Sequence, residues 1–380
     1  MEATTDPTVE RSRADTGPAK LAACGNAIRL PSAREEMSLA GPVEAGGPRV
    51  HTASTNPLTP ASGFIARRSA WLRDLPARSA LRVCNHPTIR ALLGRRYANA
   101  LEKHRNRLPA LTGLDQVIVR AVEQEGVFVT SLEALGLPAS EEILRTGQTL
   151  ASRFSAEARR RAAEGEPFLY VPPEWIIEHP ELFSWGLQDR LLDIAEAYIG
   201  LRPAYDGACI NYTVADGREI STRKWHRDWE DRRMLKVCVY LHSVDAAGGP
   251  FQIVRRSDPM QNDLEGFVYD LAGDDDLERR LGRDFTRHKL SCEGLTGTVI
   301  FMDTARFFHR GKPATASDRA AIFYSYIAER PRHPFLCERS GMARGDIARL
   351  ASALPERQRQ AAQWRSRLPF LFRLIPPARL

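Results

Sequence analysis

The chain has 380 residues and a mass of 42.5 kDa, which is long enough to bury a sizeable core without a disulfide or a structural metal. Its 43% hydrophobic and 27% charged residues are typical of a globular protein. The six cysteines are scattered, the N-terminus lacks a secretory-signal pattern, and no apolar run approaches about 18–20 residues, so we predict a cytoplasmic protein with reduced thiols.

The formal net charge of +7 is unevenly distributed. Residues 65–110 carry 11 basic and 2 acidic groups, and residues 343–380 carry 8 and 2. Residues 1–64 carry 6 and 7, which leaves 29 basic and 36 acidic groups for residues 111–342. Because 48 of the 54 basic residues are Arg in a chain rich in Ala, Gly and Pro, we attribute the excess to codon usage and predict no nucleic-acid partner. Peripheral membrane contact by the basic flanks is the less favoured alternative.

The N-terminal third begins with a segment that cannot form a core. Residues 1–62 are rich in Ala, Thr, Pro, Gly and Ser and lack sustained periodicity, so we predict that they are disordered. In residues 63–110, apolar positions alternate with arginines, which is typical of short amphipathic helices. We interpret residues 63–110 as a basic helical segment with a solvated outer face.

The next elements are mostly helical, because their apolar residues recur three and four positions apart. Gly126 and Gly200 each follow such a pattern and are predicted to end a helix. The predicted elements are a helix over 114–125, a strand over 127–132, a charged helix in two segments over 141–163, and the strongest helix over 182–199.

After residue 202 the chain consists of short alternating or apolar segments separated by turn sequences. This spacing predicts a β-sandwich or jelly roll, and hence a mainly β fold with flanking helices (α+β). Residues 260–285 are interpreted as an insertion over the sheet, and residues 341–380 as a C-terminal helix and basic tail. The predicted strands are 209–214, 235–241, 250–254, 298–302 and 320–327.

The sharpest motif is Trp-His-Arg-Asp-Trp, which places His226 and Asp228 two residues apart. On an extended segment, residues two apart point to the same side. An imidazole and a carboxylate so placed can occupy adjacent positions on one metal ion, and a second His from a distant strand would complete a facial triad. Taken alone the pair is a weak signal, because such pairs often arise by chance.

The surrounding pattern strengthens this interpretation. The strand after the pair alternates apolar and polar residues, so that one face packs and the other lines something polar. A later strand leads to His309, and Arg319 opens the strand after that. The guanidinium of Arg319 is a rigid, always-charged fork that suits a carboxylate. These residues together are a candidate site for a metal and a carboxylate.

The segments WHRDWEDRRMLKVCVYLHSVDAAGGPFQIVRRSDP and GTVIFMDTARFFHRGKPATASDRAAIFYSY resemble the phytanoyl-CoA dioxygenase family. Members of this family are iron(II)- and 2-oxoglutarate-dependent oxygenases on a double-stranded β-helix, a jelly-roll, cupin-like fold. The similarity covers residues 182–327, and we expect an oxygenase domain over 111–340 with its core at about 203–328.

The resemblance implies that His226, Asp228 and His309 ligate iron(II), and that Arg319 binds the distal carboxylate of 2-oxoglutarate, with O2 as the other co-substrate. It also implies a set of polar residues that line the pocket. These are Asn211, Lys236 and Tyr240.

The chain departs from the family at several positions. It has Arg255-Arg256-Ser257-Asp258 where the family commonly has Pro-Gly-Ser-His. Ala321 and Gly311 offer no hydroxyl where some relatives have one, so Thr315 or Tyr240 is expected to help bind the co-substrate. Position 228 is an aspartate and not Ala or Gly, so no ligand position is left free for a halide, which favours hydroxylation over halogenation.

Two other functions stay open. The chain could be a jelly-roll metalloprotein of another reaction type, or a catalytically inactive binding protein with basic flanks. The small-molecule or lipid-like substrate and the oligomeric state are not encoded in a recognisable motif.

Several further residues have a structural interpretation. His242 and His288 are expected to be structural or surface histidines, and His179 to belong to a helix start. Trp225 and Trp229 either wall the pocket or pack the strand ends. The apolar residues of the tail could touch a membrane, but we expect them to dock on the body of the protein. They are Phe370, Leu371, Phe372, Leu374 and Ile375.

Overall fold

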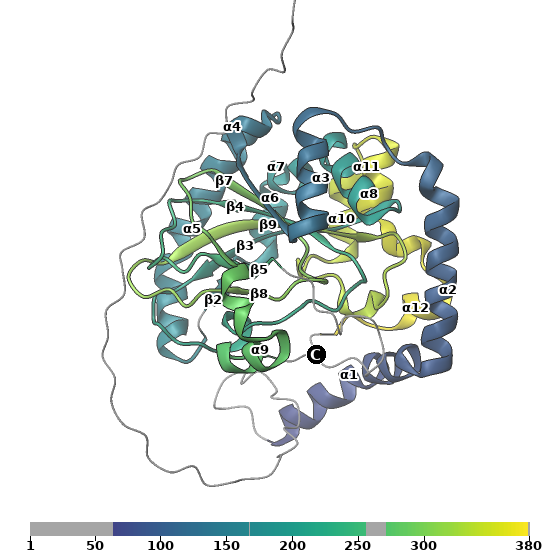
Figure 1. Cartoon of the computed structure of the whole chain (residues 1–380), viewed down its shortest axis with the longest axis horizontal. Helices are drawn as coiled ribbons and strands as arrows, with labels where there is room; N and C mark the ends of the chain where they lie inside the picture. Colours follow the sequence, from purple (N-terminus) through teal and green to yellow (C-terminus); the bar gives the residue numbers. More distant parts are fainter. Residues whose placement is uncertain (1–63, 167, 256–270, 379–380) are drawn as a thin grey trace, which may run out of the picture. The chain divides into compact units, whose positions relative to one another are not determined.

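The computed structural model describes residues 64–166, 168–255 and 271–378, with side chains in the first helix from Asp74 onward (Figure 1). The predicted disordered segment 1–62 and the predicted insertion up to residue 270 lie outside the described residues. Among the helices described, none has both the length and the apolar character needed to cross a bilayer.

The described strands form two antiparallel sheets (Figure 1). The larger sheet has the strand order β1-β7-β4-β9-β3-β2, and the smaller has the order β6-β5-β8. The strands are β1 (Val127–Ser131), β2 (Phe168–Tyr170), β3 (Pro203–Thr213), β4 (Leu235–Tyr240), β5 (Phe251–Val254), β6 (Lys289–Cys292), β7 (Thr298–Met302), β8 (His309–Gly311) and β9 (Arg319–Ala328). Antiparallel sheets with flanking helices are the class of fold that the sequence predicts.

Alternation along β4 explains how both faces of the larger sheet are covered. Val237 and Val239 belong to a core that the sheet shares with the helices. Cys238 and Tyr240 point the other way, into a second core with Phe251 of the smaller sheet. The two sheets therefore pack face to face, and the polar face predicted for this strand lies between them.

Helices precede, cover and follow the sheets. The order of the chain is α1 (Phe64–Asn85), α2 (Pro87–His104), α3 (Gly113–Glu125), α4 (Leu132–Leu135), α5 (Ser140–Ala163), α6 (Pro173–Glu178), α7 (Pro180–Trp185), α8 (Asp189–Ile199), α9 (Asp274–Leu281), α10 (Arg344–Ala351), α11 (Glu356–Ala362) and α12 (Phe370–Leu374). Gly126 and Gly200 end α3 and α8 with φ of 79° and 80°, which confirms the predicted helix stops.

Helix α5 is one continuous helix, so the prediction of two segments over 141–163 is wrong. Its Gly147 lies against the larger sheet: a Cβ there would be 2.6 Å from the Leu241 side chain and 3.0 Å from that of Ile322. Glycine thus allows α5 to approach the sheet closely without interrupting the helix.

The predicted helix over 182–199 is instead two helices, α7 and α8. Between them Gly186 presses on buried tyrosines, because a Cβ there would lie 2.6 Å from both Tyr205 and Tyr324. Its carbonyl accepts a hydrogen bond from the Tyr326 hydroxyl at 2.6 Å. The amphipathic pattern continues through this break, which is why the sequence predicts a single helix.

Three strands and the full length of a fourth are missing from the sequence prediction. β2, β6 and β8 have only three or four residues, too few for a clear alternation. β3 starts at Pro203 and is irregular around Gly207, which has a φ of 90°. The described part of the predicted insertion forms α9, whose Leu277 packs with Trp225.

Candidate metal centre

Two segments that are distant in sequence bring three candidate ligands together. His226 and Asp228 lie just before β4, and His309 is the first residue of β8. The amides of His226 and His309 each donate to the other residue's carbonyl at 3.0 Å, and the Asp228 amide donates to the Thr304 carbonyl at 2.7 Å. Backbone hydrogen bonds therefore fix both segments beside each other.

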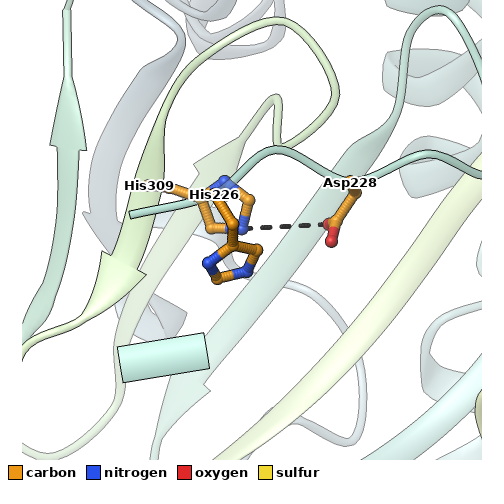
Figure 2. Close-up of side chains that lie close together, drawn as sticks. All are labelled: His226, Asp228 and His309. Atoms are coloured by element: carbon orange, nitrogen blue, oxygen red, sulfur yellow. Dashed lines mark ion pairs between the residues drawn. The ribbon is translucent and has the colours of Figure 1, made fainter. Parts of the chain in front are cut away.

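The three side chains converge on one point (Figure 2). One ligand atom from each of His226, Asp228 and His309 lies within 4.8 Å of the other two, and all three residues are buried. The imidazole rings have centroids 4.3 Å apart, and His309 Nε2 is 3.9 Å from Asp228 Oδ2. Within the described residues, this is the only cluster of three or more His, Cys, Asp or Glu with this spacing.

Hydrogen bonds leave the Nε2 atom of each histidine ready to bind a metal. His226 Nδ1 lies 2.8 Å from the Lys224 carbonyl, and His309 Nδ1 lies 3.2 Å from the Phe307 carbonyl. Because a carbonyl only accepts, each Nδ1 carries the proton and each Nε2 keeps its lone pair. Burial lowers the pKa of both rings, to about 3 for His309, so both are neutral at pH 7.

Asp228 completes the donor set as a carboxylate. Burial opposes its charge, but Lys236 and then His309 hold the pKa of Asp228 well below its usual range. Lys236 Nζ forms an ion pair with Asp228 Oδ2. Two neutral imidazoles and one ionised carboxylate are a donor set that a divalent transition metal accepts, so these residues fit such an ion.

Arg319 lies at the start of β9 with its guanidinium buried beside β8. It donates to the Gly249 carbonyl and, at 3.4 Å, to Thr213 Oγ1. A Cβ at Gly311, two residues after His309, would be 2.8 Å from Arg319 Nη2. Glycine at position 311 therefore makes room for the guanidinium, which links Arg319 to the strand that carries His309.

Asn211 is joined to Arg319 through one intervening residue. Thr213 Oγ1 donates to Asn211 Oδ1 at 2.8 Å, and the same Oγ1 accepts from Arg319. In the sheet, Asn211 and Tyr240 both pair with Ala321, so their side chains lie on one face. The sequence interpretation overlooked Thr213, although its position two residues after Asn211 on a strand would have placed it on this face.

The structure gives Tyr240 and Thr315 other contacts. The Tyr240 hydroxyl donates to the Cys292 carbonyl at 2.8 Å and accepts from the Phe251 amide at 3.0 Å. Thr315 lies on the exposed loop between β8 and β9, where its amide donates to the Ala247 carbonyl at 2.8 Å. Their contact with a co-substrate stays a prediction.

A second ion pair near the metal cluster was not predicted. Glu230 is buried, and its carboxylate pairs with the Arg339 guanidinium and accepts from the Trp229 amide at 2.8 Å. Asp206 accepts from the Arg339 amide at 3.2 Å, which ties the segment after β9 to β3. Glu230 is two residues after Asp228, so the alternation along an extended segment could have predicted that it lies on the side of the candidate ligands. No such local pattern points to Arg339.

Tyr170 is another neighbour that sequence reasoning missed. It pairs with Asn211 across β2 and β3, and 52% of it is exposed. Burial of its hydroxyl and then Cys209 raise the pKa of Tyr170, while the positive charges of Arg339 and Lys236 partly lower it. Tyr170 therefore lies on the same face of the larger sheet as Asn211 and is partly open to solvent.

Both tryptophans of the motif belong to hydrophobic clusters. Trp225 is fully buried, with Arg310 above its ring at 4.4 Å, and it packs against Phe308. Trp229 packs with residues of α1. His242 Nε2 accepts the Ala320 amide at 2.8 Å, which confirms its structural interpretation.

No protein-family model and no curated protein matches the chain. Similar solved structures include EctD from S. alaskensis with 2-oxoglutarate and 5-hydroxyectoine, which is 19% identical with a TM-score of 0.40 over 57% of this chain and 76% of that one. The non-heme alpha-ketoglutarate-dependent carbocyclase SnoK from nogalamycin biosynthesis is 17% identical, with a TM-score of 0.38 over 58% and 88%. AviO1 from Streptomyces viridochromogenes Tue57 is 14% identical, with a TM-score of 0.37 over 57% and 96%.

Proposed function

We propose that the chain is an iron(II)- and 2-oxoglutarate-dependent dioxygenase that hydroxylates a small-molecule or lipid-like substrate. The observation that carries this proposal is the buried cluster of His226, Asp228 and His309, whose ligand atoms lie within 4.8 Å of one another. Two histidines and one carboxylate form the facial triad of non-haem iron(II) oxygenases, which leaves positions for other ligands. The face-to-face antiparallel sheets support a double-stranded β-helix, and with the motifs they support membership of the phytanoyl-CoA dioxygenase family.

Iron(II), when bound, would supply the chemistry in which O2 and 2-oxoglutarate become succinate and CO2 while a substrate C–H bond is hydroxylated. The protein contributes preorganisation. His226 and His309 are oriented by their Nδ1 hydrogen bonds, so that no ring rotation is needed to present Nε2. Asp228 stays ionised beside Lys236, and burial of all three residues excludes bulk water from the ligand positions.

Arg319 is the group that we assign to the distal carboxylate of 2-oxoglutarate. Its guanidinium is buried and positioned by Gly249 and Thr213, and it lies against Gly311, two residues from a ligand. Arginine binds carboxylates with two parallel hydrogen bonds, so a guanidinium held in this way orients the co-substrate as well as attracting it. Asn211, which is hydrogen-bonded to Thr213, supports that orientation.

The substrate would enter on the side of Tyr170 and Arg339. Tyr170 offers a half-exposed ring, and the Arg339 side chain is 53% exposed although its guanidinium pairs with the buried Glu230. An aromatic surface beside a cation suits a substrate with both apolar and polar parts.

Iron binding and succinate release by the full chain test this proposal. We expect His226→Ala and Asp228→Ala to weaken iron(II) binding in anaerobic calorimetry by about 10–100-fold or more, and to abolish iron-dependent release of succinate from 2-oxoglutarate. His288→Ala is the matched control, because the His288 side chain is partly exposed and its ring lies 3.9 Å from Asp284, away from the three candidate ligands. Turnover that survives in the His226 or Asp228 variant would rule out the assignment.

The same assay separates the two alternatives. A metalloprotein of another reaction type would bind iron through these residues but release no succinate from 2-oxoglutarate. A binding protein without activity would show neither property.

A further inference from the structure

The C-terminal helix α12 exposes three large apolar side chains. The exposed fractions are 68% for Phe370, 75% for Leu371 and 63% for Leu374. At about 100° per residue these positions fall within about one third of the helix circumference, so they form one outward face. Docking of the whole tail on the body of the protein is therefore the wrong expectation for these three residues, although Phe372 and Ile375 do pack inward.

This outward face is built into the fold. Phe372 and Ile375 pack in a cluster with Cys84 of α1 and with Phe335. The Arg365 guanidinium donates to the Ile375 carbonyl at 2.6 Å and to the Pro334 carbonyl at 2.9 Å. Beyond the helix, the Ala378 amide donates to the Phe335 carbonyl at 2.8 Å. These hydrogen bonds secure the C-terminal end of α12, and the packing of Phe372 fixes which side of the helix faces inward, so the three exposed side chains point outward.

The neighbouring helices add charge and further apolar surface. Figure 1 shows α12 beside the junction of α1 and α2, in agreement with the shared cluster. Residues 65–110 carry 11 basic and 2 acidic groups, and Arg373 of α12 is exposed. The basic residues that precede α12 contribute less charge, because they form ion pairs with carboxylates: Arg344, Arg349, Arg357, Arg359, Arg365 and Arg367. On α1 and α2, Val83 is 58% exposed and Leu92 is 41% exposed, with Arg82 and Arg95 exposed nearby in sequence. We call α1, α2 and α12 together the basic apolar face.

We propose that the basic apolar face docks on the surface of a membrane that contains anionic phospholipids. Bulky apolar side chains on a short helix enter the boundary between headgroups and acyl chains, and arginines around them attract anionic headgroups. Two such weak signals together give stable yet reversible attachment. The charge argues against a second copy of the chain as the occupant, because two identical basic faces repel each other. The three apolar side chains argue against nucleic acid, which binds basic groups without them.

Co-sedimentation with vesicles tests the proposal on the full chain. We expect binding to vesicles of mixed phosphatidylcholine and phosphatidylglycerol, weaker binding at high salt, and little binding to phosphatidylcholine alone. Leu371→Ser should weaken the binding by about tenfold, because a side chain of this size loses its burial in the bilayer. Arg373→Gln should weaken binding at low salt and reduce its salt dependence.

Leu295→Ser is the matched control. Leu295 is 76% exposed, nearly the same as Leu371, but it lies in the turn between β6 and β7. Both variants should keep the melting temperature of the parent protein, since neither side chain is buried. The metal centre has no part in this assay, so its outcome does not depend on the proposed enzymatic function.

Four results would overturn the proposal. The first is no binding to anionic vesicles, and the second is the same loss of binding in Leu295→Ser as in Leu371→Ser. The third is a dimeric mass in light scattering that Leu371→Ser reduces to a monomer, which would identify the occupant as a second copy. The fourth is binding to duplex DNA that exceeds binding to anionic vesicles and is unchanged by Leu371→Ser.

Discussion

Gly311 shows that the absence of a side chain at one position can make space for the side chain of another residue. In the sequence, Gly311 is noted only because some relatives have a hydroxyl residue there, and no neighbouring residue predicts what the glycine does. In the structure it faces the guanidinium of Arg319, at a distance that leaves no room for a Cβ. Gly147 and Gly186 play the same part for buried side chains of the larger sheet.

We predict that Gly311→Ala raises the 2-oxoglutarate concentration needed for half-maximal succinate release by about tenfold, because Arg319 must move away from its place. Iron(II) affinity should be unchanged, since the backbone hydrogen bonds that position His309 remain. Gly345→Ala is the control, because a Cβ at Gly345 meets nothing within 4 Å. An unaltered co-substrate requirement in Gly311→Ala would contradict the role of Gly311 in positioning the Arg319 guanidinium.

The clustering of His226, Asp228 and His309 could be predicted from sequence, but the surroundings of this cluster could not. His226 and Asp228 are two residues apart, and the spacing of side chains on a strand is local information. His309 and Arg319 followed from strands with clear hydrophobic patterns. Tyr170 and Arg339 reach the site through pairings between distant segments, β2 with β3 and the segment after β9 with β3, which no local pattern encodes.

At the scale of elements, the largest error concerned the break between α7 and α8. Hydrophobic periodicity continues across residues 186–188 because both helices bury most of their apolar residues, and these belong to one core. The helical run breaks at Gln188, whose backbone is extended (φ −57°, ψ 138°), two residues after Gly186 packs against the rings of Tyr205 and Tyr324. Long-range packing of this kind overrides a local helical pattern.

Gly186→Ala is therefore predicted to destabilise the protein by about 1–3 kcal/mol, the usual cost of forcing atoms into a packed core. The contrast is Gly94→Ala in α2, where a Cβ meets nothing within 4 Å and alanine favours the helix by up to about 1 kcal/mol. Urea unfolding followed by circular dichroism measures both. Equal stability of the two variants would mean that the side chains around Gly186 rearrange to accommodate a Cβ at little energetic cost.

At the scale of the whole molecule, buried carboxyl groups connect the segment after β9 to the sheets. Asp206 accepts the amides of Glu338 at 2.6 Å and Arg339 at 3.2 Å, and burial raises its pKa to about 7 despite these hydrogen bonds. An unfolded chain releases this proton near pH 4. Between about pH 4 and pH 7 the folded state thus holds a proton that the unfolded state loses, so this group makes the protein less stable as the pH rises.

Asp206→Asn should flatten this part of the stability profile, since the amide stays neutral at every pH; its single oxygen can accept only one of the two backbone amides, a loss that does not vary with pH. We predict that the variant's free energy of unfolding, relative to the parent protein, increases by about 1 kcal/mol or more between about pH 5 and about pH 8. Urea midpoints at several pH values measure the difference. Parallel pH profiles for the two proteins would show that Asp206 is ionised in the folded state.

The basic and acidic residues are distributed differently between the flanking segments and the middle of the chain. The basic excess lies in the flanking segments, and the apolar residues exposed beside it, Phe370 and Leu371, belong to the same face. The metal cluster and Arg319 lie within residues 111–342, which are acidic overall. The proposed membrane attachment and the proposed chemistry therefore involve different parts of the molecule.

The most direct test of the proposed function is anaerobic titration of the iron(II)-loaded protein with 2-oxoglutarate, followed by visible absorption. We predict a new absorption band in the parent protein. The band should be absent in Asp228→Ala, and in Arg319→Ala it should require about tenfold more 2-oxoglutarate. A spectrum of the iron-loaded parent protein that does not change on addition of 2-oxoglutarate would contradict the proposed function.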